Sequence, residues 1–590
     1  MENTLWNLNN IYESFDSEKF KNNIKTLKEK IKSLYVYISS ADALSTSEVI
    51  KNYIKQTNDI LEISSMLSEY ALLRLSSNSY DNEAMKYYDI INNIISDMEK
   101  IKALFTSYIK NINNIEEIIN SNKYIKEHEF FINEIKKKSL YTLTEQEEAV
   151  YSKMRSTGSV SWEKLWENIT SSLKCKFIEN GTEKSVPLSE LRNMAYSDNS
   201  QTRKNAYFSE IESLSSVAPQ AAFALNAIKG EVINMCKIRG YKSPLNMTLI
   251  DSRISEATFS AMISAIKNSL PYFRKYFKRK AEILGHKNSL PFYDLFTPIG
   301  ENSVKFSYKE AQDFIIKNFS SFCPDMCEFA EKAFNSGWID VYPRDGKTGG
   351  AFCSNIHSIG ESRILINFTG SFNDVVTLAH ELGHAYHGEQ LNNETPINSD
   401  YPMPIAETAS TFCECIIKNN AVSALNPNMA LTLIENDISD NAQIIVDILS
   451  RFIFEDQLFK AREEGPLSAD ELCSIMEEAQ EKTYGDVLSV KHKYMWVCKP
   501  HYYDAMFNYY NFPYAFGLLF AKGLYGLYKR EGNVFVEKYK KLLSITGKAN
   551  IENIALTAGI DITKPEFWKE SINGIKTDID KFISLTENLI

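Results

Sequence analysis

The sequence predicts a mainly α-helical protein that also contains a small β-sheet. Apolar residues recur at intervals of three and four positions over most of the chain, as they do on the buried face of a helix. Strand-like runs are few and short, and glycines separate them. The chain has 590 residues, of which 44% are hydrophobic, so a large buried core can form.

The helical pattern fills the first 140 residues and most of the middle of the chain. We predict helices at 17–35, 45–75, 82–108, 115–138, 188–215, 218–239, 256–284 and 308–335. A β-hairpin is expected at 173–186, turning at Asn180-Gly181, and a proline-containing loop at 288–304. We place a boundary near residue 190, between an N-terminal helical domain, 1–190, with the hairpin near 173–187, and a second domain, 191–590.

The predicted sheet lies next to one helix in the middle of the chain. Strand-like pieces occur at 338–343, 349–354 and 363–368, with glycine or proline close to each. The residues that follow, 373–388, have the pattern of a helix that Ser371 and Asp374 open as a capping box and that Gly388 ends. We therefore expect a small sheet beside this helix.

The composition excludes several classes of partner. The formal net charge is −11 and no long basic block occurs, so we expect no nucleic-acid partner. We expect neither a signal peptide nor a membrane span, because no basic and apolar leader and no run of about 18 apolar residues is present. We therefore expect the protein to be cytoplasmic. The nine scattered cysteines are interpreted as buried reduced thiols, and His128, in a polar stretch, as exposed.

The helix at 373–388 contains the motif His-Glu-x-x-His, formed by His380, Glu381 and His384. A spacing of four residues leaves the two imidazoles about 40° apart around the helix axis and about 6 Å apart along it. Two neutral histidines can then hold one small cation, and zinc suits nitrogen ligands. Glu381 flanks that cation and can act as general base for a metal-activated water. The alternative is an exposed helix with surface histidines.

A catalytic zinc usually has three protein ligands, so the two histidines need a further partner. The candidates downstream are Glu389, Glu394, Glu407 and Glu414. The first two lie too close to the end of the same helix to fold back easily. A proline-rich connection at 392–404 precedes a second helical pattern, and an antiparallel second helix would bring Glu407 opposite the histidines.

Two nearby side chains have secondary roles in this interpretation. Glu414 falls about 20° from Glu407 on the same helical face and could orient a ligand imidazole, although an ordinary ion pair is the alternative. His387 competes as a ligand, but it lies about 10 Å along the axis from His380. A supporting or cleft-lining role fits His387 better.

An aromatic segment at 499–517 contains His501, Tyr510 and Tyr514. Neutral donors such as the tyrosine O–H and the histidine N–H stabilise an oxyanion when they are preorganised. An aromatic helix taken alone, however, is more often part of a core.

Four blocks of the chain together resemble oligoendopeptidase F, in the thimet oligopeptidase and neurolysin group of zinc metallopeptidases. The blocks are GGAFCS at 349–354, NFTGSFNDVVTLAHELGHAYHG at 367–388, AETASTFCE at 406–414 and HYYDAMFNYYNFPYAFG at 501–517. The opening Trp6-Asn7-Leu8 and the runs at 542–547 and 565–568 are similar too, so the resemblance spans nearly the whole chain.

The resemblance implies a helical bowl or prolate body with a deep substrate channel and a zinc ion at its floor. It implies that 191–590 is the catalytic domain and that GGAFCS is an edge strand that binds the substrate backbone. The site residues that it implies are His380, His384 and Glu407 as ligands to one zinc ion, Glu381 as base, and His501, Tyr510 and Tyr514 as oxyanion donors. Residues 504–506 replace the glycine-rich turn of the thimet branch.

The function that follows is the zinc-dependent hydrolysis of internal bonds in short peptides, without a nucleic-acid or membrane partner, by a monomer or small homo-oligomer. One alternative is a metallo-exopeptidase of the dipeptidyl carboxypeptidase kind. The other is a catalytically silent scaffold that binds peptides. Availability and geometry favour zinc over cobalt or manganese, though not exclusively.

Overall fold

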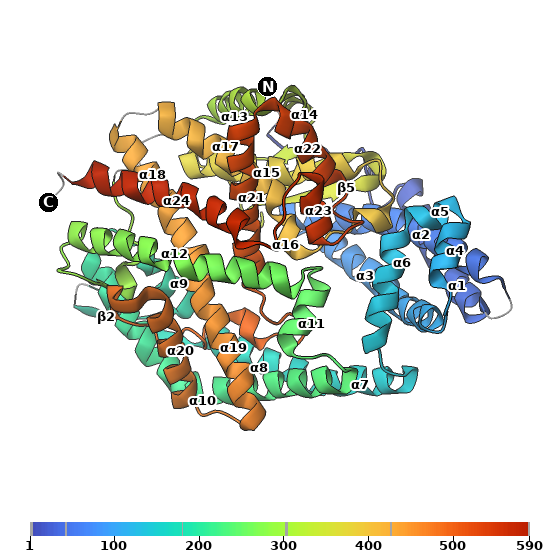
Figure 1. Ribbon diagram of the computed structural model, residues 1–590, viewed down its shortest axis with the longest axis horizontal. Coiled ribbons are helices and arrows are strands. Elements are labelled where there is room, and N and C mark those ends of the chain that lie inside the picture. Colours follow the sequence, from blue (N-terminus) through green and yellow to red (C-terminus); the bar gives the residue numbers. More distant parts are fainter. Residues whose placement is uncertain (1–3, 42–43, 180, 301–304, 425–426, 588–590) are drawn as a thin grey trace. The chain divides into compact units, whose positions relative to one another are not determined.

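Figure 1 shows the computed structural model of the protein, which describes the chain except residues 1–3, 42–43, 180, 301–304, 425–426 and 588–590. Helices form most of the described chain, and its strands belong to small sheets. The predicted class, mainly α with a small β-sheet, is confirmed. Asn180 of the predicted hairpin turn and the last residues of the predicted loop at 288–304 lie outside the described residues.

The described elements pack into two units, each built from three segments of the chain. Unit 1 comprises Met1–Thr142, Val304–Asn420 and Leu527–Ile560, and unit 2 comprises Leu143–Ser303, Ala421–Gly526 and Asp561–Ile590. The boundary predicted near residue 190 stays a prediction.

Unit 1 contains a helical N-terminal part, a small sheet and the helices around that sheet. Its helices are α1 (Glu18–Ser39), α2 (Thr46–Ser77), α3 (Asn82–Lys110), α4 (Ile115–Ser121), α5 (Lys123–Glu127), α6 (Glu129–Lys138), α13 (Tyr308–Phe322), α14 (Pro324–Asn335), α15 (Phe372–Leu391), α16 (Met403–Ala406), most of α17 (Thr408–Ala424), α22 (Asn533–Ser544) and α23 (Ile551–Thr557). Its strands are β4 (Ile339–Asp340), β5 (Phe352–Ile356) and β6 (Glu361–Leu365).

Polar residues set the ends of the N-terminal helices. The Asp81 side chain accepts a hydrogen bond from the Ala84 N–H at 3.0 Å and so caps α3. The helix predicted at 115–138 is wrong as a single element, because it divides into α4, α5 and α6. The division follows from Asn122, whose backbone is extended and whose side chain caps a new helix by accepting from Tyr124 and Ile125.

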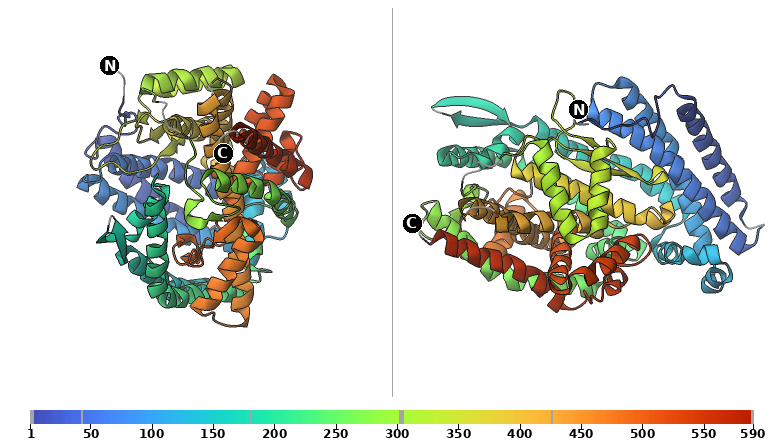
Figure 2. Two further views of the ribbon diagram at one scale, coloured as in Figure 1. Left: turned by 90° about the vertical axis from the view of Figure 1, so that its left-hand side faces the viewer. Right: turned by 90° about the horizontal axis from the view of Figure 1, so that it is seen from above.

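The helices α1, α2 and α3 lie side by side, in blue, in the right-hand view of Figure 2. Their facing sides bury apolar residues such as Leu27, Leu67 and Ile101. The same core continues to Ile356 on β5 and Leu365 on β6. The N-terminal helices are therefore packed against the sheet that adjoins α15.

The sheet of unit 1 has the order β4-β6-β5. β4 pairs with β6 in parallel, and β5 pairs with β6 antiparallel. β5 is consequently an edge strand. The sheet expected beside the helix at 373–388 is present, because α15 packs against both β5 and β6.

Unit 2 is organised around α10 (Ser200–Arg239), which packs against helices and against the hairpin. Its other helices are α7 (Glu145–Thr157), α8 (Ser159–Ser172), α9 (Leu188–Asn193), α11 (Pro244–Asp251), α12 (Glu256–Ile283), α18 (Pro427–Ala442), α19 (Ile448–Glu464), α20 (Ala469–Tyr484), most of α21 (Phe512–Glu531) and α24 (Pro565–Thr586). Its short helical turns include η4 (Phe292–Asp294), the π-helical η7 (Gln443–Asp447) and η9 (Pro500–Tyr503). Its strands are β1 (Lys174–Glu179), β2 (Thr182–Pro187), β3 (Leu290–Pro291) and β7 (Leu488–Val490).

The predicted hairpin is confirmed. β1 and β2 pair antiparallel from Lys174 opposite Pro187 to Glu179 opposite Thr182. They form the turquoise ribbon in the right-hand view of Figure 2.

Two prolines act differently from the sequence expectation. The break predicted between 215 and 218 is wrong, because α10 continues through Pro219 and buries Ala218, Ala221 and Ala222 beside it. The helix predicted at 308–335 is interrupted at Cys323, which is extended and precedes Pro324 in the first position of α14. Proline at that position lacks only an N–H that the helix would leave unpaired in any case.

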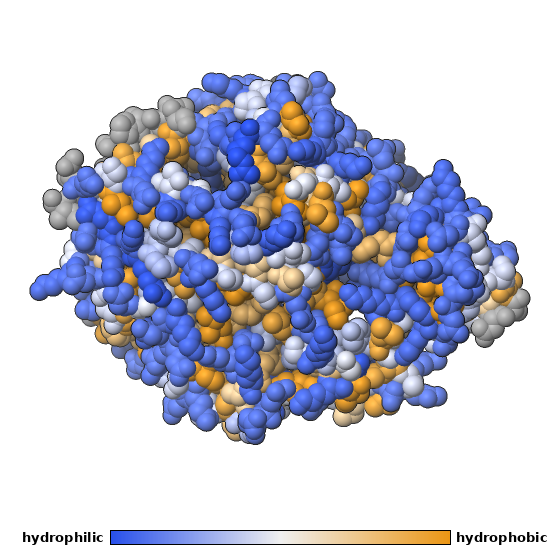
Figure 3. Space-filling view, in the orientation of Figure 1, coloured by the Kyte–Doolittle hydropathy of each residue, from blue (hydrophilic) through white to orange (hydrophobic). Residues whose placement is uncertain are grey.

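Polar and charged residues cover most of the face shown in Figure 3, and apolar residues are scattered among them. Among the described helices, none combines the length and the apolar composition that crossing a membrane requires.

Candidate metal centre

The two ends of α15 are set by a capping box at its start and by close packing near its end. The predicted capping box is present: the Ser371 hydroxyl accepts from the Asp374 N–H and the Asp374 carboxylate accepts from the Ser371 N–H, both at 3.1 Å. The predicted end at Gly388 is wrong, because the helix continues to Leu391. Gly388 instead makes room for Asn355, since a Cβ at this position would lie 2.5 Å from the Asn355 Cγ.

The chain after α15 returns to it closely. At Gly383 a Cβ would meet the Ala409 carbonyl oxygen and the Ser410 Cα, both at 2.6 Å. The backbones of α15 and α17 therefore touch at the middle of the His-Glu-x-x-His motif. Glu407 lies at the junction between α16 and α17, and this close approach brings its side chain to the two histidines.

Three ligand atoms converge between these helices. His380 Nε2 lies 3.2 Å from His384 Nε2 and 3.2 Å from Glu407 Oε2, and His384 Nε2 lies 3.5 Å from the same Glu407 oxygen. Ser410 donates to that oxygen at 3.1 Å and so holds the carboxylate in place. Among the described residues, this is the group of histidine, cysteine and acidic side chains whose atoms could hold a metal ion.

The spacing of the three atoms fits zinc. Bonds of about 2.0–2.1 Å directed at tetrahedral angles place any two ligand atoms about 3.3 Å apart. The observed separations of 3.2, 3.2 and 3.5 Å lie close to that value. Two imidazole nitrogens and one carboxylate oxygen are also donors that zinc prefers, and three protein ligands leave a fourth position open.

Glu414 fixes the orientation of one of these imidazoles. His380 Nδ1 lies 2.7 Å from Glu414 Oε1, so the contact expected from the sequence is present. The other oxygen of Glu414 is 2.8 Å from Lys418 Nζ, one helical turn further along α17. Burial raises the pKa of Glu414, but Lys418 and His380 outweigh it and lower the pKa to about 2. An ionised Glu414 accepts the Nδ1 proton and leaves the Nε2 lone pair of His380 for a cation.

The electrostatics of the group favour a positive charge at its centre. Burial lowers the pKa of His380, but hydrogen bonds with Glu407 and Glu414 outweigh it and raise the pKa to about 10. Burial and the charge of His380 lower the pKa of His384 to about 4. The pair thus holds one proton, and a divalent cation would replace that proton among the same carboxylates.

Glu381 is prepared for proton transfer. Its side chain is 5% exposed and makes no hydrogen bond to any residue in the described part of the chain. Burial, with Glu407 and Glu414, raises the pKa of Glu381 to about 7, although His380 opposes the shift. A carboxyl group that titrates near neutral pH and lies next to the ligands can both accept and release a proton.

His387 has a structural role. It is fully buried, its ring stacks on Tyr401 at a centroid distance of 4.2 Å, and its Nε2 lies 2.8 Å from the Thr546 hydroxyl. Because that hydroxyl donates to the Leu543 carbonyl, it accepts from His387. The run at 542–547 therefore packs against α15 through this hydrogen bond. His387 does not belong to the group of converging side chains.

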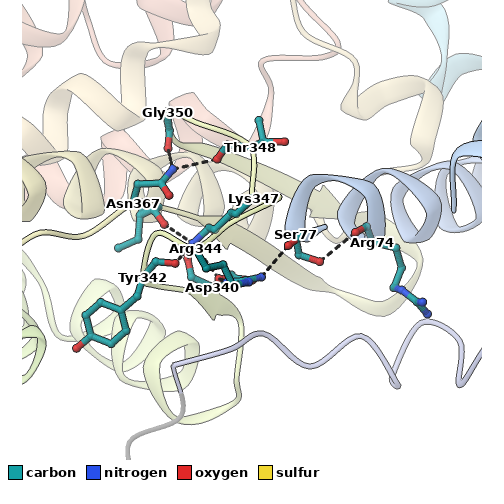
Figure 4. Close-up of polar contacts among 10 residues, drawn as sticks. Arg74, Ser77, Asp340, Tyr342, Arg344, Lys347, Thr348, Gly350 and Asn367 are labelled. Carbon is teal, nitrogen blue, oxygen red and sulfur yellow. Dashed lines mark hydrogen bonds and ion pairs between the residues drawn. The ribbon is translucent and has the colours of Figure 1, made fainter. Parts of the chain in front are cut away.

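The edge strand β5 is hydrogen-bonded directly to α15. The Asn355 side-chain amide donates to the His384 carbonyl at 3.2 Å and accepts from Ser362 on β6 at 2.7 Å. The loop that leads into β5 is tied down as well, as Figure 4 shows. Lys347 donates to the carbonyls of Tyr342 and Ile366 at 2.9 and 2.6 Å.

The same loop is anchored at both of its ends (Figure 4). Arg344 makes a two-pronged ion pair with Asp340 at 2.6 and 2.7 Å and donates to the Ser77 carbonyl of α2 at 3.0 Å. Asn367 donates to the carbonyls of Thr348 and Gly350 at 3.0 and 2.8 Å. The loop before β5 is thus held by the Ser77 carbonyl of α2 and by the Asn367 side chain, both in unit 1.

The remaining predicted site residues belong to unit 2. His501 lies on η9, and its buried Nε2 has no hydrogen-bond partner. Burial, with Arg451, Lys499 and Lys229, lowers the pKa of His501 to about 2, so the imidazole is neutral. The rings of Tyr510 and Tyr514 lie 5.7 Å apart, edge to face.

Burial separates the tyrosines of this segment into two groups. Tyr502, Tyr503 and Tyr509 are buried, as expected for an aromatic core. Tyr510 is partly exposed and Tyr514 is 37% exposed. The two tyrosines singled out from the sequence are therefore accessible to a ligand.

Sequence reasoning missed three residues that shape the centre. Lys418 follows Glu414 by four residues, a spacing that could have indicated an ion pair on one helix face. Ser410 follows Glu407 by three residues, a spacing that could have indicated a hydrogen bond from its hydroxyl to the carboxylate. Asn355 lies 29 residues before His384 and has no local signal, because only the tertiary fold brings it there.

A helix with the motif His-Glu-x-x-His, a carboxylate that could serve as the third ligand, and a neighbouring carboxylate without a hydrogen bond are typical of metal-dependent hydrolases. Residues 193–574 match the family model Peptidase family M3, and the chain belongs to this family of metallopeptidases. Residues 111–174 match the model named Oligopeptidase F. The protein is therefore a peptidase, and its resemblance to the oligoendopeptidase F group is confirmed.

Similar proteins agree with this assignment. Oligopeptidase PepF of Bacillus subtilis is 24% identical over 572 residues, which cover 95% of this chain and 84% of that protein. The crystal structure of oligoendopeptidase-F from Enterococcus faecium superimposes with a TM-score of 0.72 at 16% identity, covering 97% of this chain and 99% of that one. A structure from Chlamydophila abortus superimposes with a TM-score of 0.86 at 20% identity, covering 99% and 98% of the two chains. These structures show the shared fold.

Proposed function

We propose that this peptidase is a zinc-dependent endopeptidase that hydrolyses internal bonds of short peptides. The main support is the convergence of three ligand atoms beside a carboxylate that makes no hydrogen bond, in a chain of peptidase family M3. His380, His384 and Glu407 hold the zinc ion, and Glu414 orients His380. The cellular location and the oligomeric state stay predictions.

The residues around the zinc ion move the protons. Zinc in this group supplies a Lewis acid that polarises the scissile carbonyl and the attacking water. Glu381 accepts a proton from that water and then delivers it to the leaving amine. Burial raises the pKa of Glu381 in the metal-free site, and no hydrogen bond holds its carboxylate, so the group is available to accept and release a proton.

His501, Tyr510 and Tyr514 donate hydrogen bonds to the oxyanion of the tetrahedral intermediate. This role rests on the resemblance of the block at 501–517, and the neutral imidazole of His501 and the partial exposure of the two tyrosines support it. Removal of one such donor lowers kcat by about 10²–10³-fold. We therefore expect Tyr514→Phe and Tyr510→Phe to lower kcat, and Tyr509→Phe, at a buried neighbour, to affect stability only.

The substrate backbone binds along the free edge of β5. On β6 the Ile364 N–H donates to the carbonyl of Trp338, just before β4, and the Ile366 N–H donates to the carbonyl of Asp340 in β4. The backbone groups of Arg363 and Leu365 therefore face β5. Their partners Ser354 and Phe352 face β6 in return, and Cys353 and Asn355 turn their N–H and C=O groups outward. Among the described residues, none pairs with those outward groups, so a peptide can add to the sheet as a fourth strand beside α15.

A doubly blocked fluorogenic nonapeptide tests the proposal. We expect internal cleavage that 1,10-phenanthroline stops and added zinc restores, together with about one zinc ion per chain by elemental analysis. Cleavage that requires a free terminus would instead establish an exopeptidase. Bound zinc without cleavage of any peptide in a length series would establish a silent scaffold.

A further inference from the structure

Unit 2 contains a charged cavity of about 340 Å³ whose walls include none of the residues assigned to the metal centre or to the oxyanion. Its walls come from α9, α10, η4, η7, α19 and the segment 492–499. We propose that this cavity is a second binding site, which takes a small anion whose carboxylate or phosphate oxygens accept hydrogen bonds from Lys499, His492 and Arg451.

One basic side chain on the wall has no acidic partner, because the third ion pair is completed by Asp294 behind the lining. Four basic side chains and two carboxylates line the cavity, and three of the basic ones have acidic partners. Those pairs are Arg203 with Asp294 at 2.7 Å, Arg192 with Glu210 at 3.1 Å, and Arg451 with Asp447.

The fourth cation is Lys499. Its ammonium group makes no hydrogen bond and no ion pair within the described chain. Burial, followed by the charges of Arg451 and Arg192, lowers the pKa of Lys499 to about 8, although Cys498 and Asp447 oppose the shift. An anion in the cavity would supply the counter-charge that this ammonium group lacks.

His492 provides a second unused donor. The residue is 1% exposed and lines the cavity. Its Nε2 lies 3.4 Å from the Glu210 carboxylate, whereas its buried Nδ1 makes no hydrogen bond. At least one ring nitrogen of a histidine carries a proton, so a donor is present. Buried polar groups without partners are rare in folded proteins, and a bound ligand is one explanation of such a group. The buried Nε of Arg451 is unpaired as well.

The cavity is a built structure, because several buried side chains fix its donors. The Gln480 amide holds His492 from both sides, donating to its carbonyl at 3.0 Å and accepting from its N–H at 2.9 Å. The Trp166 indole donates to the Val497 carbonyl at 2.8 Å, two residues before Lys499. Asp447 ends the π-helical turn η7, a distortion that often marks a functional site in proteins.

Aromatic side chains form the rest of the wall and indicate what else the anion carries. Tyr207, Phe292 and Phe296 line the cavity, and the Phe292 ring lies 5.1 Å from that of His492. Flat apolar walls beside excess donors suit an organic anion with a ring or a short hydrocarbon part. Benzoate and inorganic phosphate are therefore the two probes, one for each possible source of the oxygens.

Calorimetric titration of the full-length metal-loaded protein with sodium benzoate and with sodium phosphate, against sodium chloride of equal ionic strength, tests the site. We expect saturable binding of at least one of the two probes. Lys499→Gln should weaken that binding at least tenfold. His492→Asn should also weaken it. Lys493→Gln is the matched control, because Lys493 lies on the same segment but does not line the cavity.

The metal centre must be excluded as the place of binding, since anions also bind zinc. In His384→Ala, which removes a metal ligand of unit 1, anion binding at the cavity should persist unchanged. The measurement should also show proton uptake on binding near pH 8–9 in buffers of different ionisation heat, because the anion restores the pKa of Lys499.

Three outcomes would overturn the proposal: no saturable binding of either probe, binding that His384→Ala abolishes, or binding that both Lys499→Gln and His492→Asn leave intact. Circular dichroism of each variant verifies its fold. If Lys499→Gln does not fold, His492→Asn alone decides. None of these readouts is turnover, so the result is independent of the proposed endopeptidase activity.

Discussion

The candidate metal centre of unit 1 and the charged cavity of unit 2 contain similar types of residue but have an excess of opposite charge. Both contain buried histidines, carboxylates and basic side chains. In the metal centre, Glu381, Glu407 and Glu414 outnumber Lys418, and lone pairs converge on one point. In the cavity the basic side chains are in excess, and unpaired N–H groups line a space of about 340 Å³.

In the two proposed sites the sign of the excess charge, and not the presence of histidine, is what distinguishes a cation site from an anion site. His380 has a carboxylate at Nδ1, which turns its Nε2 into an acceptor for a cation. His492 faces Glu210 through Nε2 at 3.4 Å, and its buried Nδ1 has no hydrogen bond. Its ring can therefore place a proton toward an anion.

The largest expected effect separates the two sites completely. Glu381→Gln should lower kcat on the blocked peptide by about 10³-fold or more, because the general base is lost. Zinc content and anion binding in unit 2 should both stay at wild-type levels. Glu389→Gln, at a carboxylate near the end of the same helix, is the control. Activity of Glu381→Gln within tenfold of wild type would disprove the mechanism.

The next effect concerns the partner that orients His380. Glu414→Gln should weaken zinc binding by about 10–100-fold, since supporting carboxylates contribute that much to metal affinity. Chelator competition measures the affinity. Excess zinc should then restore turnover, unlike in Glu381→Gln, and unchanged affinity would mean that the Glu414 contact with His380 is an ordinary ion pair.

A third prediction compares the backbone packing of the two units. Gly383→Ala forces a Cβ against the Ala409 carbonyl and should destabilise the protein by about 1–3 kcal/mol and weaken zinc binding. Gly574→Ala on α24 meets nothing within 4 Å and should instead stabilise it by up to about 1 kcal/mol, through helix propensity. Relative to wild type, the melting temperature should fall for Gly383→Ala and rise for Gly574→Ala. A neutral Gly383→Ala would contradict the close approach of α15 and α17.

The smallest effect contrasts two carboxylates. The pKa of Glu414 is lowered to about 2, whereas burial, with Asp437, raises the pKa of Asp578 in unit 2 to about 6 against the opposing charge of Lys522. Folded Asp578 therefore binds a proton between pH 4 and 6 that the unfolded chain releases, so its contribution to stability falls as pH rises through this window.

Asp578→Asn should remove that pH dependence. The difference in unfolding free energy between variant and wild type should grow in favour of the variant by roughly 1–2 kcal/mol from pH 4 to pH 7, after allowance for solvent screening. Denaturant titrations at several pH values measure it. A difference that does not change with pH would contradict the raised pKa of Asp578.

Much of the fold was predictable because helical periodicity is local. The helices at 45–75, 82–108 and 256–284 match α2, α3 and α12 to within a few residues. The errors occur where side chains compete with the pattern. Asn122 caps a new helix inside a continuous apolar repeat, and tertiary packing carries α10 through Pro219.

His128 shows the same limit for a single side chain. Its polar neighbours predict exposure, yet it is 1% exposed. Its ring nitrogens contact the Tyr124 carbonyl and the Thr395 hydroxyl, both at 2.9 Å. The partner from residue 395 is invisible in the local sequence.

The sequence by itself indicated the candidate residues of the metal centre, because His380, Glu381 and His384 share one helix and Glu414 follows Glu407 by two turns. Spacing along a helix fixes direction in space, so the common direction of these side chains could be predicted. The tertiary structure alone decided the convergence of the three ligand atoms, the link from Asn355 to α15, and the cavity of unit 2. Residues 192, 210, 447, 492 and 499 meet there only because long-range packing joins segments that no periodicity relates.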